Sequence, residues 1–236
     1  MSTSAATTRT SDSHRNKYAV TGFGYTCTVE EVLDALVKVA RPIILESFSV
    51  DSCIASTRIA VDVLHYFEIT AEPLPLIVTV FNAETVRLTH EGKTLEEIGK
   101  IKNQSKVTDD GGPWAVGIGT GWSMKSTNGS EPWAGHLVAA IPDDHIIVDL
   151  SIDQVTRPHK NMYLEPFWTH VEDDWWGGDK PVTELNNAGM SMILNRAAVD
   201  PQGFLTSPNW KLSGLYRATF KDATGRIIRA IKKEIA

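Results

Sequence analysis

The stretch that decides the fold is Gly135-His-Leu-Val-Ala-Ala-Ile-Pro-Asp-Asp-His-Ile-Ile-Val-Asp-Leu-Ser151. Two runs rich in aliphatic and β-branched residues flank a short segment of turn-forming residues, which is the pattern of a β-hairpin. If Asp143-Asp144 is the two-residue loop, Val138 lies opposite Asp149 on the neighbouring strand. The hairpin therefore predicts antiparallel sheet structure in the middle of the chain.

This register also sorts the side chains of the hairpin by face. Six aliphatic residues point to one face: Leu137, Ala139, Ile141, Ile146, Val148 and Leu150. His136 and Asp149 point to the other face as diagonal neighbours, about 7–8 Å apart at the backbone and within reach of their side chains. A register shift of one residue would separate them onto opposite faces. The pairing of the two therefore depends on the turn.

Towards the N-terminus, the spacing of apolar residues predicts two helices. Thr28 and Glu31 form a capping box, and the helix that follows is expected to end or kink at Pro42. A second helix begins at Asp51-Ser52 and places Cys53 in its first turn. A strand rich in β-branched and aromatic residues follows at 75–81.

The rest of the chain gives weaker patterns. We expect short helical structure around 95–98, a short strand at 114–118 inside a Gly-rich stretch (103–135), a helix at 183–198, a last strand at 212–220 and an amphipathic closing helix at 225–236. Residues 1–17 are too polar to form a core and are expected to be a disordered tail. The prediction is a single α+β domain over 18–236.

Composition excludes several classes of function. The chain of 236 residues carries 23 basic and 29 acidic residues, and its net charge of −6 argues against general nucleic-acid binding. The longest apolar run, 74–81, is far shorter than the ~18 residues of a spanning helix, and the start of the chain has no apolar signal-peptide core. Cys27 and Cys53 make no disulfide framework. We therefore expect a reduced, cytoplasmic protein with no membrane or nucleic-acid partner.

Cys53, His136 and Asp149 are the candidate catalytic residues. The first turn of a helix has free N–H groups and a positive dipole end, which stabilise a thiolate. A nearby imidazole would accept the thiol proton, and a carboxylate would fix the orientation and tautomer of that imidazole. A cysteine at a helix start, followed by a histidine and an aspartate on paired strands, is a more specific pattern than any of the three alone.

This arrangement resembles the transglutaminase-like superfamily of papain-like cysteine enzymes. The matching segments are Asp51-Ser-Cys-Ile-Ala-Ser56, Ala134-Gly-His-Leu-Val138 and Val148-Asp-Leu-Ser-Ile-Asp-Gln154, within residues 45–155. The resemblance implies a papain-like core, in which N-terminal helices include a catalytic helix packed on an antiparallel sheet. It also implies Cys53 as nucleophile, His136 as base and Asp149 as orienting group. Many members carry an upstream Gln or Trp as oxyanion donor; residues 43–52 have neither, which leaves Ser52 or the Cys53 backbone.

The expected function is therefore a thiol enzyme, a protease, amidase or acyltransferase, that acts on a peptide, protein or small amide through a Cys53 thioester and needs no cofactor or metal. One alternative is a non-catalytic module of the same fold that binds a protein through Trp-rich loops, such as that of Trp175-Trp176. Another is a metal-dependent hydrolase using His136, His145 and Asp149. A phosphate loop at Gly117-x-Gly119-x-Gly121 is disfavoured, because the Lys-Ser/Thr of a P-loop is missing.

Overall fold

The computed structural model describes residues 27–104, 112–119, 135–187, 189–196, 202–212 and 216–236. The expected tail at 1–17 and most of the Gly-rich stretch lie outside these residues. Helices and antiparallel strands alternate irregularly along the chain, so the α+β class is confirmed.

Seven α-helices are present in the described residues: α1 (Val29–Leu45), α2 (Cys53–Tyr66), α3 (Ala83–His90), α4 (Leu95–Gln104), α5 (Asp173–Gly177), α6 (Pro208–Lys211) and α7 (Tyr216–Ile235). The strands are β1 (Glu72–Phe81), β2 (Ala115–Ile118), β3 (His136–Ile141), β4 (Ile146–Asp149), β5 (Phe167–His170), β6 (Val182–Asn187) and β7 (Met190–Asn195). Short 3₁₀ helices lie between them: η1 (Pro142–Asp144), η2 (Ile152–Val155), η3 (Pro158–Lys160) and η4 (Gly203–Thr206).

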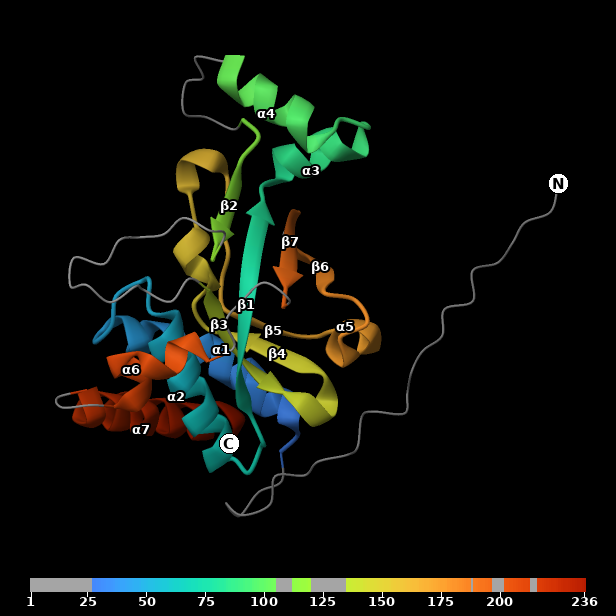
Figure 1. Ribbon diagram of the computed structural model, residues 1–236. Helices are drawn as coiled ribbons and strands as arrows, with labels where there is room; N and C mark the ends of the chain where they lie inside the picture. The colour runs from blue at the N-terminus through green and yellow to red at the C-terminus, as the bar shows by residue number, and fades with distance from the viewer. Residues whose placement is uncertain (1–26, 105–111, 120–134, 188, 197–201, 213–215) are drawn as a thin grey trace.

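The strands form one curled sheet in the order β5-β4-β3-β1-β7-β6, with β2 also paired to β1 (Figure 1). Every strand pair is antiparallel. The long strand β1 holds the sheet together, because residues 72–76 pair with β3 and residues 77–81 pair with β7. Figure 1 shows α1, α2 and α7 gathered near β3 and β4, while α3 and α4 lie at the far end of β1.

The predicted hairpin register is confirmed. Ala139 pairs with Val148, Ala140 with Ile147 and Ile141 with Ile146, which is the register obtained from an Asp143-Asp144 loop. The turn itself is the 3₁₀ helix η1, closed by His145 in the left-handed conformation at φ 51°. The local turn residues therefore set which side chains of β3 and β4 share a face.

Both faces of this part of the sheet are buried. One core lies under α1, α2 and α7, and from the hairpin it takes Ala139, Ile141, Ile146, Val148 and Leu150. The other core takes Val138 and Ile147 from the hairpin and packs them against β1, β7, η2 and α5. His136 and Asp149 lie in this buried environment, with 0% and 2% of their surfaces exposed.

The N-terminal helices begin where the sequence predicts. The Thr28–Glu31 capping box of α1 is formed in both directions, and α2 starts at Cys53 after Ser52 as N-cap. Pro42 does not end α1, which continues to Leu45. Burial of Ile44 in the first core offsets the hydrogen bond that a proline cannot donate.

Three predictions for the second half of the chain are wrong. Residues 183–198 do not form a helix; they lie largely in the hairpin β6–β7, whose turn contains Gly189 at φ 77°. Residues 212–220 do not form a strand, because α7 already begins at Tyr216. The closing helix is thus nine residues longer at its N-terminal end than the apolar pattern from Gly225 suggests. In the first half of the chain, the short helix expected around 95–98 is confirmed as α4, and α3 precedes it.

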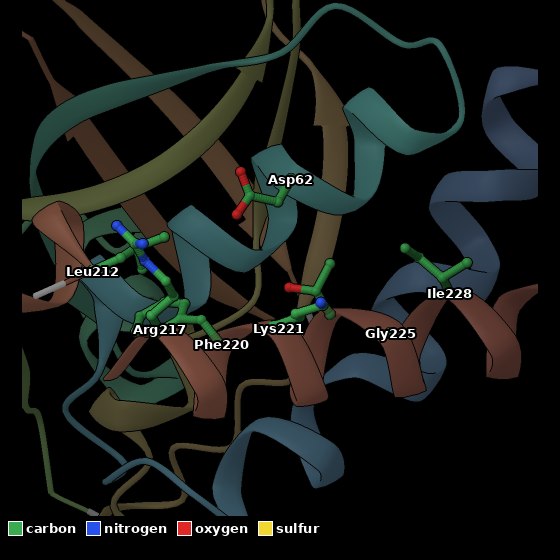
Figure 2. A pocket seen from close by; sticks show the side chains of 8 residues that line it. Asp62, Leu212, Arg217, Phe220, Lys221, Gly225 and Ile228 are labelled. Carbon is green, nitrogen blue, oxygen red and sulfur yellow. The ribbon is translucent and has the colours of Figure 1, made fainter. Parts of the chain in front are cut away.

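A pocket of about 370 Å³ lies between α2 and α7 (Figure 2). Apolar side chains such as Phe220 and Ile228 line it together with Asp62. None of the three candidate catalytic residues lines this pocket. Within the described residues, no helix combines the length and apolar character needed to cross a bilayer.

Candidate active site

Cys53 is the first residue of α2, so its thiol lies at the positive end of a 14-residue helix. The first hydrogen bond of the helix runs from Ser56 N to Ser52 O at 2.8 Å. The N–H groups of the first turn therefore have no acceptor within the helix, and the side chain of Ser52 does not cap them. Cys53 is half-buried, whereas His136 and Asp149 are fully buried.

The start of α2 lies beside the start of β3. Thr57 Oγ1, one turn after Cys53, donates a 2.6 Å hydrogen bond to the carbonyl oxygen of Leu137. This contact fixes the helix against the strand at the residue next to His136. Cys53 and His136, 83 positions apart in the chain, are therefore brought to the same region of the fold.

His136 and Asp149 form a direct pair across the hairpin. His136 Nε2 donates to Asp149 Oδ2 at 2.6 Å. The second carboxylate oxygen, Oδ1, accepts from the backbone N–H of Ser151 at 2.9 Å and lies 3.4 Å from its hydroxyl. Because both carboxylate oxygens are held, the ring has one defined orientation, with Nδ1 as the nitrogen left to exchange a proton.

The electrostatics of the site favour a charged imidazole. Burial is the largest single effect and lowers the pKa of His136, while the charge of Asp149 and its hydrogen bond raise that pKa. The Cys53 thiol contributes a further increase through a hydrogen bond and its charge. The result is that the pKa of His136 is raised to about 10. A ring with a raised pKa thus lies in the same site as the thiol at the start of α2.

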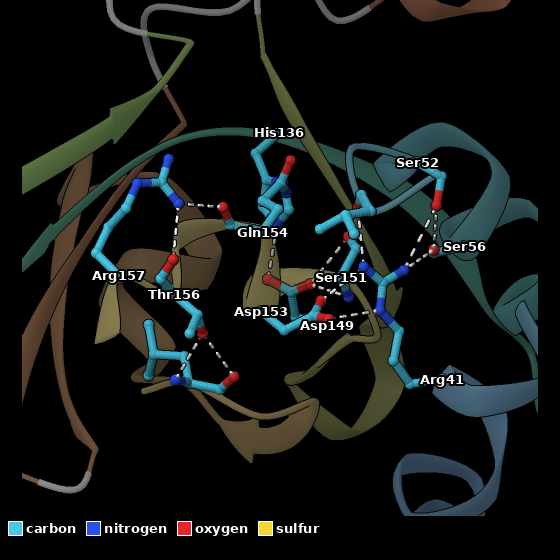
Figure 3. Close-up of polar contacts among 12 residues, drawn as sticks. Arg41, Ser52, Ser56, His136, Asp149, Ser151, Asp153, Gln154, Thr156 and Arg157 are labelled. Atoms are coloured by element: carbon cyan, nitrogen blue, oxygen red, sulfur yellow. Dashed lines mark hydrogen bonds and ion pairs between the residues drawn. The ribbon is translucent and has the colours of Figure 1, made fainter. Parts of the chain in front are cut away.

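Gln154 contacts the ring of His136, and the sequence did not predict a role for this glutamine. Its side-chain Nε2 lies 3.0 Å from Nδ1 of His136 (Figure 3). The short helix η2 carries Gln154 five residues after Asp149. The signal was present in the Asp-x-Ser-x-x-Gln spacing of residues 149–154, which supported the resemblance to known enzymes without indicating a function for the glutamine.

Arg41 is a second residue near the site that the sequence did not predict. Its side chain is 6% exposed and forms an ion pair with Asp153 at 2.7 Å. It donates to the carbonyl of Val50 at 2.8 Å and lies 3.4 Å from the hydroxyls of Ser52 and Ser56. Figure 3 shows it between the start of α2 and the segment that bears Gln154. The only sequence signal was a cation near the C-terminal end of an amphipathic helix, which does not reveal its partners.

The other candidate residues lie elsewhere. His145 is at the hairpin turn, where Nδ1 bonds to Asp173 at 2.7 Å and the ring stacks on Trp176. Among the residues that the structure describes, no group of three His, Cys, Asp or Glu side chains is placed to hold a metal ion. Trp175 is fully buried in the second core, so this tryptophan is part of the packing rather than an exposed docking surface.

The packing around Gly119 and around Cys27 explains why each residue stands at its position. Gly119 adopts φ 80°, and a Cβ there would approach Gly135 Cα to 2.9 Å, so it is needed for the close passage of the chain before β3. Gly121 lies outside the described residues. Cys27 is buried in the first core, and its burial together with Glu31 raises the pKa of its thiol. A thiol in this environment is less reactive than a free cysteine.

The raised pKa of His136 predicts a pH-dependent contribution to stability. The unfolded ring has a pKa of ~6.5, so the contribution is complete below that pH and is lost as the pH rises towards 10. We expect the difference in unfolding free energy between Cys53→Ala and Cys53→Ala/His136→Asn to fall by about 1.4 kcal/mol per pH unit above pH 6.5. The Cys53→Ala background is needed because a thiol that gives up its proton while the ring keeps one would cancel the slope. Urea denaturation at several pH values measures it.

The exposed His90 supplies the control for this measurement. The control variant is His90→Asn in the same Cys53→Ala background, since His90 is exposed and ends α3, outside the hairpin that carries His136. If the curves of Cys53→Ala and Cys53→Ala/His136→Asn were parallel, the ring would not hold its proton more tightly in the folded protein.

Comparison with known proteins adds no further identification. No protein family, curated protein or solved structure matches this chain.

Proposed function

We propose that this protein is a thiol enzyme with a papain-like, transglutaminase-like core, which cleaves or transfers an acyl group at an amide bond. Cys53 is the nucleophile, His136 the proton carrier and Asp149 the group that orients and charges the imidazole. One observation carries the proposal: a half-buried thiol at an uncapped helix N-terminus acts on the pKa of an imidazole that is fully buried and bonded to a carboxylate at 2.6 Å.

In the first step, the Cys53 thiolate would attack the carbonyl carbon of the amide. The carbonyl oxygen becomes an oxyanion, for which the first-turn N–H groups of α2 are ready donors. The hydroxyl of Ser52 is a weaker candidate, because Ser52 is 5% exposed and its oxygen faces Arg41 and Ser56. The C–N bond then breaks, and Nδ1 of His136 gives its proton to the departing amine.

In the second step, the now neutral His136 would take a proton from an incoming water or amine. That nucleophile attacks the thioester carbon, the C–S bond breaks, and the thiolate and the imidazolium are restored. Water gives hydrolysis of the amide, and an amine gives acyl transfer. Asp149 keeps the ring in place through both steps, since Nε2 stays bonded to it.

Alkylation with iodoacetamide, followed by mass spectrometry of the Cys53 peptide, tests the proposal. An ordinary thiol with a pKa of ~8.5 reacts roughly a hundredfold faster at pH 8 than at pH 6, because its thiolate fraction changes by that factor. We expect the rate at Cys53 to be nearly constant over this range. In His136→Ala we expect the steep pH dependence of an ordinary thiol to return.

Cys27 provides a control within the same chain, since its thiol is buried in the first core and has a raised pKa. It should stay unmodified in the folded protein and react only after denaturation. A rate at Cys53 that rises steeply with pH and ignores the His136 change would overturn the proposal. That outcome would favour a non-catalytic module with the same fold.

A further inference from the structure

Nδ1 of His136, the ring nitrogen that is not bonded to Asp149, has a partner to which the proposed reaction assigns no role. Gln154 Nε2 lies 3.0 Å from Nδ1 of His136, while Nε2 of the ring is already bonded to Asp149. A fully buried imidazole needs a partner at each nitrogen, because an unsatisfied buried polar group carries a desolvation penalty. During the reaction, sulfur cannot always be that partner: once it is acylated, it no longer accepts a strong hydrogen bond.

An amide side chain suits a nitrogen that changes its protonation state. Its N–H group donates to the neutral ring, and after a half-turn its carbonyl oxygen accepts from the charged ring. Aspartate, glutamate or lysine in this place would serve only one of the two states well. A glutamine serves both without a change in backbone position.

The backbone around Gln154 is held from several sides. Its N–H donates to the carbonyl of Ser151, the residue that also binds Asp149, at 3.1 Å. Its carbonyl accepts from Arg157 at 2.9 Å, and the preceding Asp153 is ion-paired with Arg41. The amide is thus placed by the same segment that holds the carboxylate, as Figure 3 shows.

We propose that Gln154 is a positioning residue that holds Nδ1 of His136 towards Cys53 in both protonation states of the ring. This role rests on the proposed thiol chemistry. The titratable groups that act on the ring are Asp149 from β4 and Cys53 from α2. The Arg41–Asp153 pair lies one residue from Gln154 and is charge-balanced.

Two variants of similar size separate positioning from simple packing. Gln154→Met keeps the volume and removes the hydrogen bonds, so alkylation of Cys53 at pH 7 should slow about tenfold, the effect of one lost hydrogen bond. Gln154→Glu keeps an acceptor for the charged ring and should restore the rate to within about threefold of wild type. If Gln154 only filled space, the order would reverse, because the apolar methionine would be tolerated better than a charge in a half-buried place.

Thr156→Val is the matched control on the same segment. Its hydroxyl bonds only to the backbone of Leu164, at 3.2 and 3.3 Å, and does not touch the ring. This variant should lower the thermal unfolding midpoint while leaving the alkylation rate within twofold of wild type. A rate loss as large as that of Gln154→Met would assign the Gln154 effect to general loosening of the segment.

The same two variants in a Cys53→Ala background test Gln154 without any thiol chemistry. NMR titration of the His136 ring should give a midpoint at least one pH unit higher in Gln154→Glu than in Gln154→Met, since the carboxylate contacts the charged ring. Coincident midpoints would overturn the role of Gln154. An unreactive Cys53 in the wild type, with the midpoints still separated, would overturn the proposed enzyme function and leave the contact to Nδ1 standing.

Discussion

Asp149→Asn is expected to reduce the alkylation rate of Cys53 at pH 6 by roughly 300-fold, because an ordinary thiol with a pKa of ~8.5 is only about 0.3% thiolate at that pH. The reason is specific to this site. Asp149 uses one oxygen for His136 and the other for Ser151. An asparagine has one acceptor and one donor, so either the ring or the Ser151 N–H faces the wrong group.

The carboxylate charge is also what keeps the ring protonated. The pKa of His136 is lowered by burial and raised mainly by Asp149. Without that charge, burial dominates, the ring becomes neutral at pH 6, and the thiol keeps its proton. The pH dependence of alkylation in Asp149→Asn should therefore become that of an ordinary thiol, measured with the same peptide mass spectrometry.

Ser151→Ala is the control that changes the surroundings of Asp149 without removing its charge. It removes a hydroxyl 3.4 Å from the carboxylate but keeps both the charge and the backbone N–H bond. Its alkylation rate should stay within about fivefold of wild type, the size of one weak hydrogen bond. Equal rates in Asp149→Asn and the wild type would mean that Asp149 has no part in activating Cys53.

The sequence is sufficient for the parts of the site that depend on local patterns. Turn residues between two apolar runs determine the β3–β4 register, and that register alone brings His136 and Asp149 to one face. Cys53 begins a helix because Asp51-Ser52 breaks the preceding segment and an apolar face follows. These features need no knowledge of the rest of the fold.

Arg41 and Gln154 depend on contacts between distant segments, which local patterns do not encode. Arg41 meets Asp153 across 112 positions of the chain, and no periodicity of α1 indicates that its cation would be buried. The helix predicted at 183–198 is wrong for a related reason. The apolar residues of this segment fit a helical spacing, but pairing of β7 with the long strand β1 decides the outcome.

The Arg41–Asp153 pair leads to the largest expected change in stability, and the effect should be asymmetric. The Arg41 side chain is 6% exposed and that of Asp153 is 23% exposed. Asp153→Ala would leave a buried guanidinium with only neutral partners, which typically costs about 3–5 kcal/mol of unfolding free energy. Arg41→Met would remove the buried charge itself and leave a carboxylate that can turn towards water, so its cost should be clearly smaller.

Urea denaturation of both single variants and of the double variant measures this asymmetry and the coupling of the pair. Asp62→Ala is the matched control, because Asp62 pairs with Arg58 on the surface of α2 at 3.1 Å with both side chains about 30% exposed. Such a pair contributes about 0.2–1 kcal/mol. Equal losses in Asp153→Ala and Asp62→Ala would show that Arg41 is solvated in the protein. In that case the cation could not serve as the fixed link between Ser52, at the start of the Cys53 helix, and the segment that carries Gln154.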